Sequence, residues 1–233
     1  IIGIDMTEEM LDNARKALGR VADRLGFLNC EFRQGYLEDV PVESESAHLV
    51  TSNCVINLSP DKSKVFAEIY RILKDGGRFV VSDIVADKEV PVNMMNEQRL
   101  WGECVSGALT QTEFLSRSKE AGFYGLQILK SLEYKEVNGI RFSSITVLGY
   151  KFKKGKDCVY TGQYAAYLGP HSEVCDDDGH IFPRGVAVEI CTDTAKKLSQ
   201  PPYAGQFIVT DAERDGDGKP NQCCPQEEGK PCC

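Results

Sequence analysis

The chain has 233 residues, of which 42% are hydrophobic and 27% are charged, the proportions of an ordinary globular protein. No apolar run approaches the roughly 20 residues that a membrane-spanning helix needs, which excludes a membrane-spanning protein. We therefore expect no membrane partner. The composition also excludes bulk disorder. The net charge of -8 at pH 7 repels the phosphate backbones of nucleic acids, so nonspecific nucleic-acid binding is excluded as well.

The chain contains 10 cysteines, well below the density of a small disulfide scaffold, in which about 8 to 10% of residues are cysteine. They are Cys30, Cys54, Cys104, Cys158, Cys175, Cys191, Cys223, Cys224, Cys232 and Cys233. Their spacing lacks the paired CxxC motifs of a zinc site, so we expect single thiols in a reducing compartment and a cytoplasmic location. Since the first residue is Ile1 rather than methionine, we expect the natural amino terminus, with any targeting signal, to lie upstream.

The first predicted elements are a strand and a helix. Residues 1–5 (IIGID) form a short apolar run that predicts a strand, and Thr7 then offers a cap for a helix that lasts until Gly26. Apolar residues at three- and four-residue steps predict one buried face on that helix. They are Leu11, Ala14, Leu18, Val21 and Leu25.

Three further strands and a second helix follow along the chain. Residues 28–36 predict a strand, residues 47–57 (AHLVTSNCVIN) a buried strand, and residues 78–86 (RFVVSDIVA) another strand. Between the last two, residues 59–76 predict a helix that opens on Ser-Pro-Asp and ends at a pair of glycines. Strands that alternate with helices in this way predict a doubly wound α/β fold, in which a mostly parallel sheet is covered on both faces.

The remainder of the chain predicts a hairpin and a second module. After a helical region at residues 93–121, Asn138-Gly139 separates two strand-like segments, which predicts an antiparallel hairpin at the edge of the sheet. We expect the first domain to cover residues 1–152. A small α+β module is expected at residues 153–213, and a disordered, cysteine-rich tail at residues 214–233.

Two acidic segments lie where a doubly wound sheet binds nucleosides, at the carboxyl ends of strands. Asp5 can accept both hydroxyls of a ribose, or it can cap the following helix, and the spacing favours neither. Residues 35–39 (GYLED) can frame an adenine, although a solvated acidic turn is the more common structure of such a segment.

Five segments, in this order, carry a family resemblance: IIGIDMT, GYLEDVP, SNCVINLSPDK, EIYRILKDGGRFVVSD and WGECVSGAL. The chain resembles the S-adenosylmethionine-dependent methyltransferases, and specifically the arsenite methyltransferases. The run EIYRILKDGG is generic to many small-molecule methyltransferases, whereas SNCVINLSPDK and WGECVSGAL are far more specific. The resemblance covers residues 1–152 strongly and continues more loosely through the second module. It implies a Rossmann-like sheet and the transfer of a methyl group to arsenic(III), which detoxifies arsenic.

The resemblance implies a set of residues for S-adenosylmethionine. The set is Asp5 at the ribose, Met6 against the adenine, the pair Leu37 and Glu38 on the adenine side, and Asn53 in the wall of the pocket. It also implies features that these 233 residues do not contain. These are a first strand with a Gly-rich loop, which holds the methionine end of the cofactor, and further cysteines before that strand.

For arsenic(III) the resemblance implies Cys54 and Cys104 as thiolate ligands, with Glu103 as an acid beside the site. Trivalent arsenic is soft and three-coordinate, so it prefers sulfur ligands. Because the attacking group is a lone pair on arsenic, no general base has to remove a proton before attack on the methyl group, and catalysis consists of positioning and desolvation. The three histidines accordingly show no pairing that suggests a catalytic triad.

Further expectations concern the partners of this reaction. A third thiol would come from the segment that is not present or from glutathione. The substrate would be arsenite or its glutathione conjugate, and a thiol reductant such as glutathione or thioredoxin would reset the arsenic and the thiols. We expect the protein to be a monomer.

Other interpretations stay open. A lone cysteine after a strand is most often a small buried hydrophobe. The generic motifs also fit a methyltransferase that acts on an organic small molecule, and the missing loop fits a thiol-rich, metalloid-binding fragment without catalysis. The run Asp176-Asp177-Asp178-Gly179 lacks the ligand pattern of a calcium loop and predicts a solvated turn. The paired cysteines of the tail are as consistent with metalloid capture as with an inert role.

Overall fold

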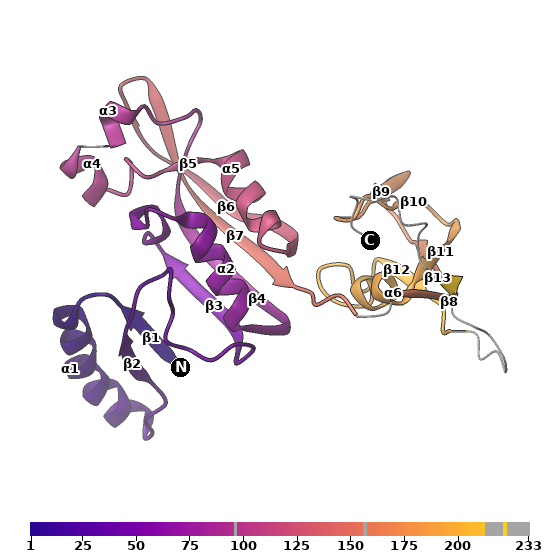
Figure 1. Cartoon of the computed structure of the whole chain (residues 1–233), viewed down its shortest axis with the longest axis horizontal. Helices are drawn as coiled ribbons and strands as arrows, with labels where there is room; N and C mark the ends of the chain where they lie inside the picture. The colour runs from indigo at the N-terminus through magenta and orange to yellow at the C-terminus, as the bar shows by residue number, and fades with distance from the viewer. Residues whose placement is uncertain (96, 156–157, 213–220, 223–233) are drawn as a thin grey trace. The chain divides into compact units, whose positions relative to one another are not determined.

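A computed structural model describes residues 1–95, 97–155, 158–212 and 221–222 of the chain. These residues divide into two compact units, residues 1–149 and residues 150–233 (Figure 1). No helix of the described residues is both long enough and apolar enough to cross a membrane.

The first unit begins with a parallel pair of strands joined by a helix. Strand β1 (Ile2–Asp5) pairs with β2 (Glu31–Gln34), and α1 (Glu8–Leu25) connects them (Figure 1). Gly26 ends α1 in the left-handed region with a φ of 76°, as the sequence predicts. The predicted buried face of α1 is wrong at Val21 and Leu25, which are 47% and 53% exposed, because two short strands cannot cover an 18-residue helix. Leu11 is buried, and Ala14 and Leu18 are half-buried.

The larger sheet of the first unit contains five strands. They are β3 (Ala47–Asn53), β4 (Leu73–Ala86), β5 (Leu109–Thr110), β6 (Phe123–Val137) and β7 (Ile140–Lys151). Their order is β3-β4-β7-β6, with β5 also paired to β4. The pairs β3-β4 and β4-β5 are parallel, as predicted for an α/β sheet of this kind.

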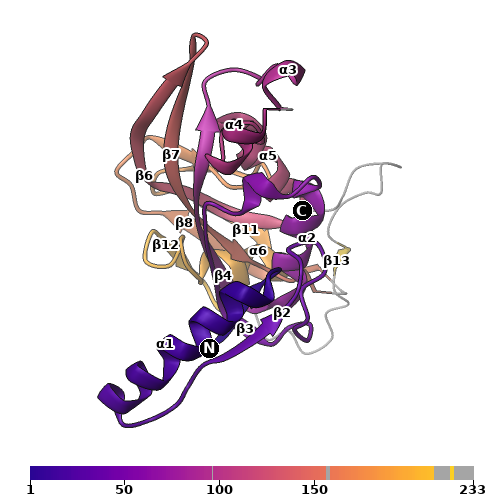
Figure 2. The same cartoon turned by 90° about the vertical axis from the view of Figure 1, so that its left-hand side faces the viewer.

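The hairpin is also confirmed. Strands β6 and β7 lie side by side (Figures 1 and 2), joined at Asn138 and Gly139, which both have positive φ, 52° and 74°. Two positive φ values in succession are what a tight hairpin turn between right-twisted strands requires.

The other helices of the first unit are α2 (Lys62–Ile72), α3 (Val92–Met95), α4 (Gln98–Gly102) and α5 (Gln111–Glu120), with a 3-10 turn η1 (Ile56–Leu58). The side chain of Asp61 caps α2 by accepting from the backbone N–H of Lys64 at 3.0 Å. The core of this unit forms where α2 and α5 cover the sheet, and Phe66 packs edge-on against Phe114 with ring centroids 5.2 Å apart.

Three predictions about these elements need correction. The second helix ends at Ile72 rather than at the glycine pair, because Leu73 already pairs with β3 and begins β4. The helical region at residues 93–121 is interrupted by β5. Strand β3 is not fully buried, since β4 is its sole partner among the described strands and Leu49 is exposed.

No described strand joins the β1-β2 pair to the larger sheet. One edge of β1 and one edge of β3 therefore lack a strand partner within the described residues.

The second unit is built around β8 (Val159–Tyr167). This strand pairs antiparallel with β11 (Ala187–Cys191) on one side and with β12 (Phe207–Val209) on the other. Strands β9 (Glu173–Cys175) and β10 (Ile181–Pro183) form a separate pair, and helix α6 (Thr192–Leu198) follows β11. The core consists of Ala165, Tyr167, Phe182, Ile190, Ala195 and Leu198.

The cysteine-rich tail that we expected to be disordered lies outside the described residues, apart from Asn221–Gln222. These two residues form β13, which pairs with β8, so for them the prediction of disorder is wrong.

Candidate active site

The structure brings together two cysteines that lie 50 residues apart in the sequence. Cys54 directly follows β3, and Cys104 lies in the turn after α4. The thiol of Cys104 donates a hydrogen bond to the backbone carbonyl oxygen of Cys54 at 3.0 Å. Cys104 belongs to an apolar cluster, and Cys54 packs against that cluster.

Both cysteines have an uncommon backbone conformation. Cys54 has a φ of 56° and Cys104 a φ of 58°, in the left-handed region that costs a residue with a side chain about 1 kcal/mol or more. The surrounding structure must therefore fix both turns. The N–H of Cys54 donates to the carbonyl of Ser82 on β4, and the N–H of Cys104 donates to the carbonyl of Trp101.

The environment keeps both thiols protonated at neutral pH. Burial raises the pKa of Cys104 to about 11, and the negative charge of Asp83 and the neighbouring Cys54 add to the effect. Burial, followed by the charge of Asp83, also raises the pKa of Cys54. At neutral pH, deprotonation of either thiol is therefore favourable only when a ligand takes the place of the proton.

The raised pKa predicts how Cys104 reacts with iodoacetamide. Because the thiolate is the nucleophile, the alkylation rate of Cys104 should rise about tenfold per pH unit up to about pH 11, whereas that of a free cysteine peptide levels off above about pH 8.5. Mass spectrometry of the peptide that contains Cys104 measures this rate. A plateau at the same pH as that of the free peptide would show that burial does not control this thiol.

Glu103 points away from its neighbour Cys104 toward the hairpin. It forms ion pairs with Lys135 on β6 and with Arg99, the latter at 3.4 Å. The hydrogen bond from Lys135 lowers the pKa of Glu103, so this carboxylate stays ionised. Lys135 also lines a cavity of about 510 Å³ between the ends of β4 and β5, the start of α5 and the hairpin.

The two residues expected at the ribose and adenine lie at the end of β1. One carboxylate oxygen of Asp5 accepts from both the N–H and the hydroxyl of Thr7, each at 2.8 Å, which is an Asx turn just before α1 rather than a cap of its first N–H groups. Thr7 itself makes no side-chain cap, contrary to our prediction, because its hydroxyl is directed back to Asp5. The side chain of Met6 is exposed, and its carbonyl accepts from Gln34 at 3.1 Å.

The other three expected cofactor residues lie beside the larger sheet. Leu37 is half-buried against the core, and Glu38 accepts a hydrogen bond from the hydroxyl of Ser59. Asn53 ends β3, and its side-chain oxygen is 3.7 Å from the sulfur of Cys54. Asn53 thus contacts Cys54 directly.

Two buried polar residues of this region were missed by sequence analysis. Asp83 on β4 is fully buried and accepts from the backbone N–H groups of Ile84 at 2.8 Å and of Asn57 at 3.2 Å. Asn57, in η1, donates to the carbonyl of Cys104 at 3.0 Å. The available signal was an ionisable residue inside the apolar run RFVVSDIVA, since a buried charge in a strand is rare unless it is satisfied.

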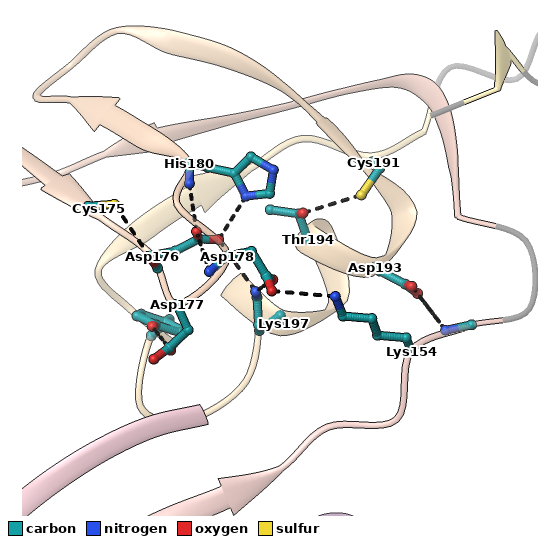
Figure 3. A network of polar contacts seen from close by, with 12 residues as sticks. Lys154, Cys175, Asp176, Asp177, Asp178, His180, Cys191, Asp193, Thr194 and Lys197 are labelled. Carbon is teal, nitrogen blue, oxygen red and sulfur yellow. Dashed lines mark hydrogen bonds and ion pairs between the residues drawn. The ribbon is translucent and has the colours of Figure 1, made fainter. Parts of the chain in front are cut away.

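The second unit contains a separate polar network (Figure 3). The ligand atoms of Asp176, Asp178 and His180 lie within 4.8 Å of one another, a spacing that suits a cation. The ammonium of Lys197 is already that cation, since it pairs with Asp178 and lies 3.4 Å from Asp176. The predicted solvated turn is wrong at Asp176, whose side chain is almost fully buried because Lys197 and His180 compensate its charge.

Charge compensation is visible in the pKa values of this network. Burial alone would raise the pKa of Asp176, but the hydrogen bond from His180 and the charge of Lys197 lower it overall. Burial lowers the pKa of Lys197, and Asp176 partly offsets that effect.

Comparison with known proteins places this geometry in a class. A family model described as a methyltransferase domain matches residues 1–122, and a model described as a domain of unknown function matches residues 154–232. The YcgJ protein of Bacillus subtilis has the same fold over 66% of this chain and 82% of its own, with a TM-score of 0.53 and 19% identity. The first unit is thus a methyltransferase domain.

More similar proteins narrow the class. Arsenite methyltransferases of Mus musculus and Homo sapiens are each 34% identical to the chain over 90% of its length and 60% of theirs. The crystal structure of an arsenic(III) S-adenosylmethionine methyltransferase from Chlamydomonas reinhardtii superposes with a TM-score of 0.64 and 32% identity. It covers 91% of this chain and 77% of that one. The chain belongs to the arsenite methyltransferase family, and it spans about 60% of the length of the curated mammalian relatives.

Proposed function

We propose that this chain carries the arsenic-binding part of an enzyme that transfers a methyl group from S-adenosylmethionine to arsenic(III), and that Cys54 and Cys104 are the ligands. The observation that carries the proposal is the hydrogen bond between the thiol of Cys104 and the carbonyl of Cys54 at 3.0 Å. Two cysteines in direct contact match the preference of a soft, three-coordinate metalloid for sulfur.

The residues of the chain have a simple task in this reaction. They hold arsenic so that its lone pair faces the methyl donor, and they exclude water from the apolar cluster around Cys104. S-adenosylmethionine supplies an electrophilic methyl group. No residue has to remove a proton from the nucleophile, so the ion-paired Glu103 is proposed to act on the charge and position of the turn that carries Cys104.

The residues present fit one end of the cofactor. Asp5 has a second carboxylate oxygen for a ribose hydroxyl, and the exposed Met6 and half-buried Leu37 offer apolar surface to an adenine. Glu38 and Asn53 complete the proposed set. The five residues provide no partners for the methionine end, which the family resemblance places on a Gly-rich loop outside these 233 residues.

We propose the remaining partners from the same chemistry. The substrate is arsenite or its glutathione conjugate, and the third sulfur ligand comes from glutathione or from another segment. Methyl transfer takes arsenic formally from the trivalent to the pentavalent state, so a thiol reductant such as glutathione or thioredoxin must return it. The cysteine usage favours the cytoplasm. We propose that the protein acts as a monomer.

The test is an arsenite methylation assay on a full-length version of the chain. Tritiated methyl groups from S-adenosylmethionine should appear in methylarsenicals, and Cys54→Ser should abolish their formation, whereas Cys30→Ser serves as the matched control. Activity that survives Cys54→Ser would contradict the proposal, and faster methylation of an organic acceptor would favour the alternative enzyme. Calorimetry with S-adenosylmethionine on the 233 residues tests the fragment interpretation, which micromolar binding would exclude.

A further inference from the structure

Two buried polar side chains, those of Asn57 and Asp83, lie next to the turns that carry Cys54 and Cys104. The proposed chemistry does not use them. Asp83 is 0% exposed and Asn57 is 2% exposed. Asn57 is hydrogen-bonded to Ile84 and Cys104, which belong to one apolar cluster. Burial of a charge or an amide is unfavourable by several kcal/mol unless hydrogen bonds compensate it. Both side chains must therefore form hydrogen bonds that compensate for their burial, and these bonds join the segments that carry the two cysteines.

Asp83 fixes the turn that follows Cys54. Its carboxylate accepts from the backbone N–H of Asn57 at 3.2 Å and from that of Ile56. The other oxygen accepts from the N–H of Ile84 at 2.8 Å, on the same strand. Because η1 begins two residues after Cys54, these bonds fasten the downstream side of Cys54 to β4, while the N–H of Cys54 itself is bonded to Ser82.

Asn57 joins that turn to the turn of the second cysteine. Its Nδ2 donates to the carbonyl of Ile84 at 2.7 Å and to the carbonyl of Cys104 at 3.0 Å. Because both partners are carbonyl oxygens, the amide must present its NH₂ group to them. Its own oxygen, Oδ1, is buried without a hydrogen-bond partner among the described residues. A buried unsatisfied acceptor costs about 1–3 kcal/mol, so stability alone does not account for this amide.

The turn of Cys104 lies directly against η1. A side-chain Cβ at Gly107 would come within 2.0 Å of the carbonyl oxygen of Asn57, a distance that forces one of the two segments to move. Gly107 therefore permits the close approach that lets Asn57 reach Cys104.

The positive φ values of both cysteines make this support necessary. Each conformation is unfavourable by about 1 kcal/mol or more, and it persists only where neighbouring groups fix it. Without the amide of Asn57, the turn that carries Cys104 loses its bond to η1 and can relax away from Cys54.

We infer that Asn57 and Asp83 are positioning residues that hold the two thiols at the separation needed to bind one arsenic atom. This inference rests on the proposed function of Cys54 and Cys104. When arsenic has bound one of the two cysteines, the other thiol is present at a high effective concentration, so the second As–S bond forms readily. If the turns that carry the cysteines become mobile, this effective concentration falls, although each thiol remains in place.

The test measures capture of a trivalent arsenical by two thiols. Phenylarsine oxide reacts with two thiols to form two As–S bonds and releases its oxygen as water. The affinity is measured by competition with 2,3-dimercaptopropanol, in a chain whose tail residues Cys223, Cys224, Cys232 and Cys233 are replaced by serine so that they cannot compete. Asn57→Ala should lower this affinity by about tenfold or more. The rate of single alkylation of Cys54 by iodoacetamide should change by less than about twofold.

Controls separate positioning from general loss of structure. Ser118→Ala removes another fully buried hydrogen bond, to the carbonyl of Phe114, and should leave the arsenical affinity unchanged. Gly107→Ala should lower the affinity as Asn57→Ala does while both cysteines and Asn57 remain, and it decides the question if Asn57→Ala does not fold. Unchanged affinity in a folded Asn57→Ala variant, or in Gly107→Ala, would overturn the inference.

The same assay separates failure of the inference from failure of the proposed function. If Cys54→Ser also leaves the affinity unchanged, the thiol pair is not the arsenic site. If Cys54→Ser removes high-affinity capture and Asn57→Ala does not, the thiol pair stands and the positioning role is wrong.

Discussion

The substitution Cys104→Ser should lower the affinity of the chain for phenylarsine oxide by about 100-fold or more. The thiol of Cys104 lies against the backbone of Cys54, so the second As–S bond forms within the same molecule. Oxygen is a much poorer ligand than sulfur for a soft metalloid, and Cys104→Ser therefore leaves one As–S bond where the native pair makes two. Competition with 2,3-dimercaptopropanol in the background with serines in place of the tail cysteines measures the change.

The matched control for this prediction is Cys30→Ser. Cys30 is a half-buried thiol of the same unit that precedes β2, and its replacement should leave the affinity within about twofold of the native value. Equal affinities for the Cys104→Ser and Cys30→Ser variants would mean that arsenic is bound elsewhere. A loss in both would point to a change in the fold of the unit instead of the loss of a ligand.

The second large effect is expected in the other unit. Lys197→Met should destabilise that unit by about 3–5 kcal/mol, because it removes the buried ammonium group that pairs with both Asp176 and Asp178. The side chain of Lys197 is only 3% exposed, and its ammonium contacts both Asp176 and Asp178. Methionine fills a similar volume, so the loss should come from charge rather than from packing. Native-state hydrogen exchange at the amides of β8 reports the stability of this unit.

Lys196→Met is the control for Lys197→Met. Lys196 is the preceding residue of α6 and its side chain is exposed, so its replacement should change the stability by less than about 1 kcal/mol. If the β8 amides were equally protected from hydrogen exchange in the two variants, solvent rather than Lys197 would compensate the charges of Asp176 and Asp178.

The sequence pattern was sufficient for the order and type of most elements. Alternating apolar runs and amphipathic segments predicted β1, α1, β3 and α2, and Asn138-Gly139 predicted the hairpin from the local demand for positive φ. Several of the failures concern burial. Apolar residues of α1 and β3 were expected to be covered, but coverage depends on how many strands lie beside them, which periodicity does not reveal.

The candidate site was predictable only in part, for a similar reason. Cys54 and Cys104 stood out because each lies in a specific motif, and the fold brings them together. Asn57 and Asp83 did not stand out, because their importance lies in hydrogen bonds to backbone groups up to 47 residues away along the chain. The left-handed conformation of a cysteine also has no sequence signature, since it is imposed by neighbours rather than preferred by the residue.

The edges of β1 and β3 that lack a strand partner within the described residues affect how the isolated chain will behave during these measurements. Each of these strands presents a row of main-chain donors and acceptors that no described strand fills, and such rows are templates on which extended peptides assemble. Copies of the chain at high concentration should therefore adhere through these edges. Light scattering across a dilution series would define the concentration range in which thiol binding can be measured on dispersed molecules.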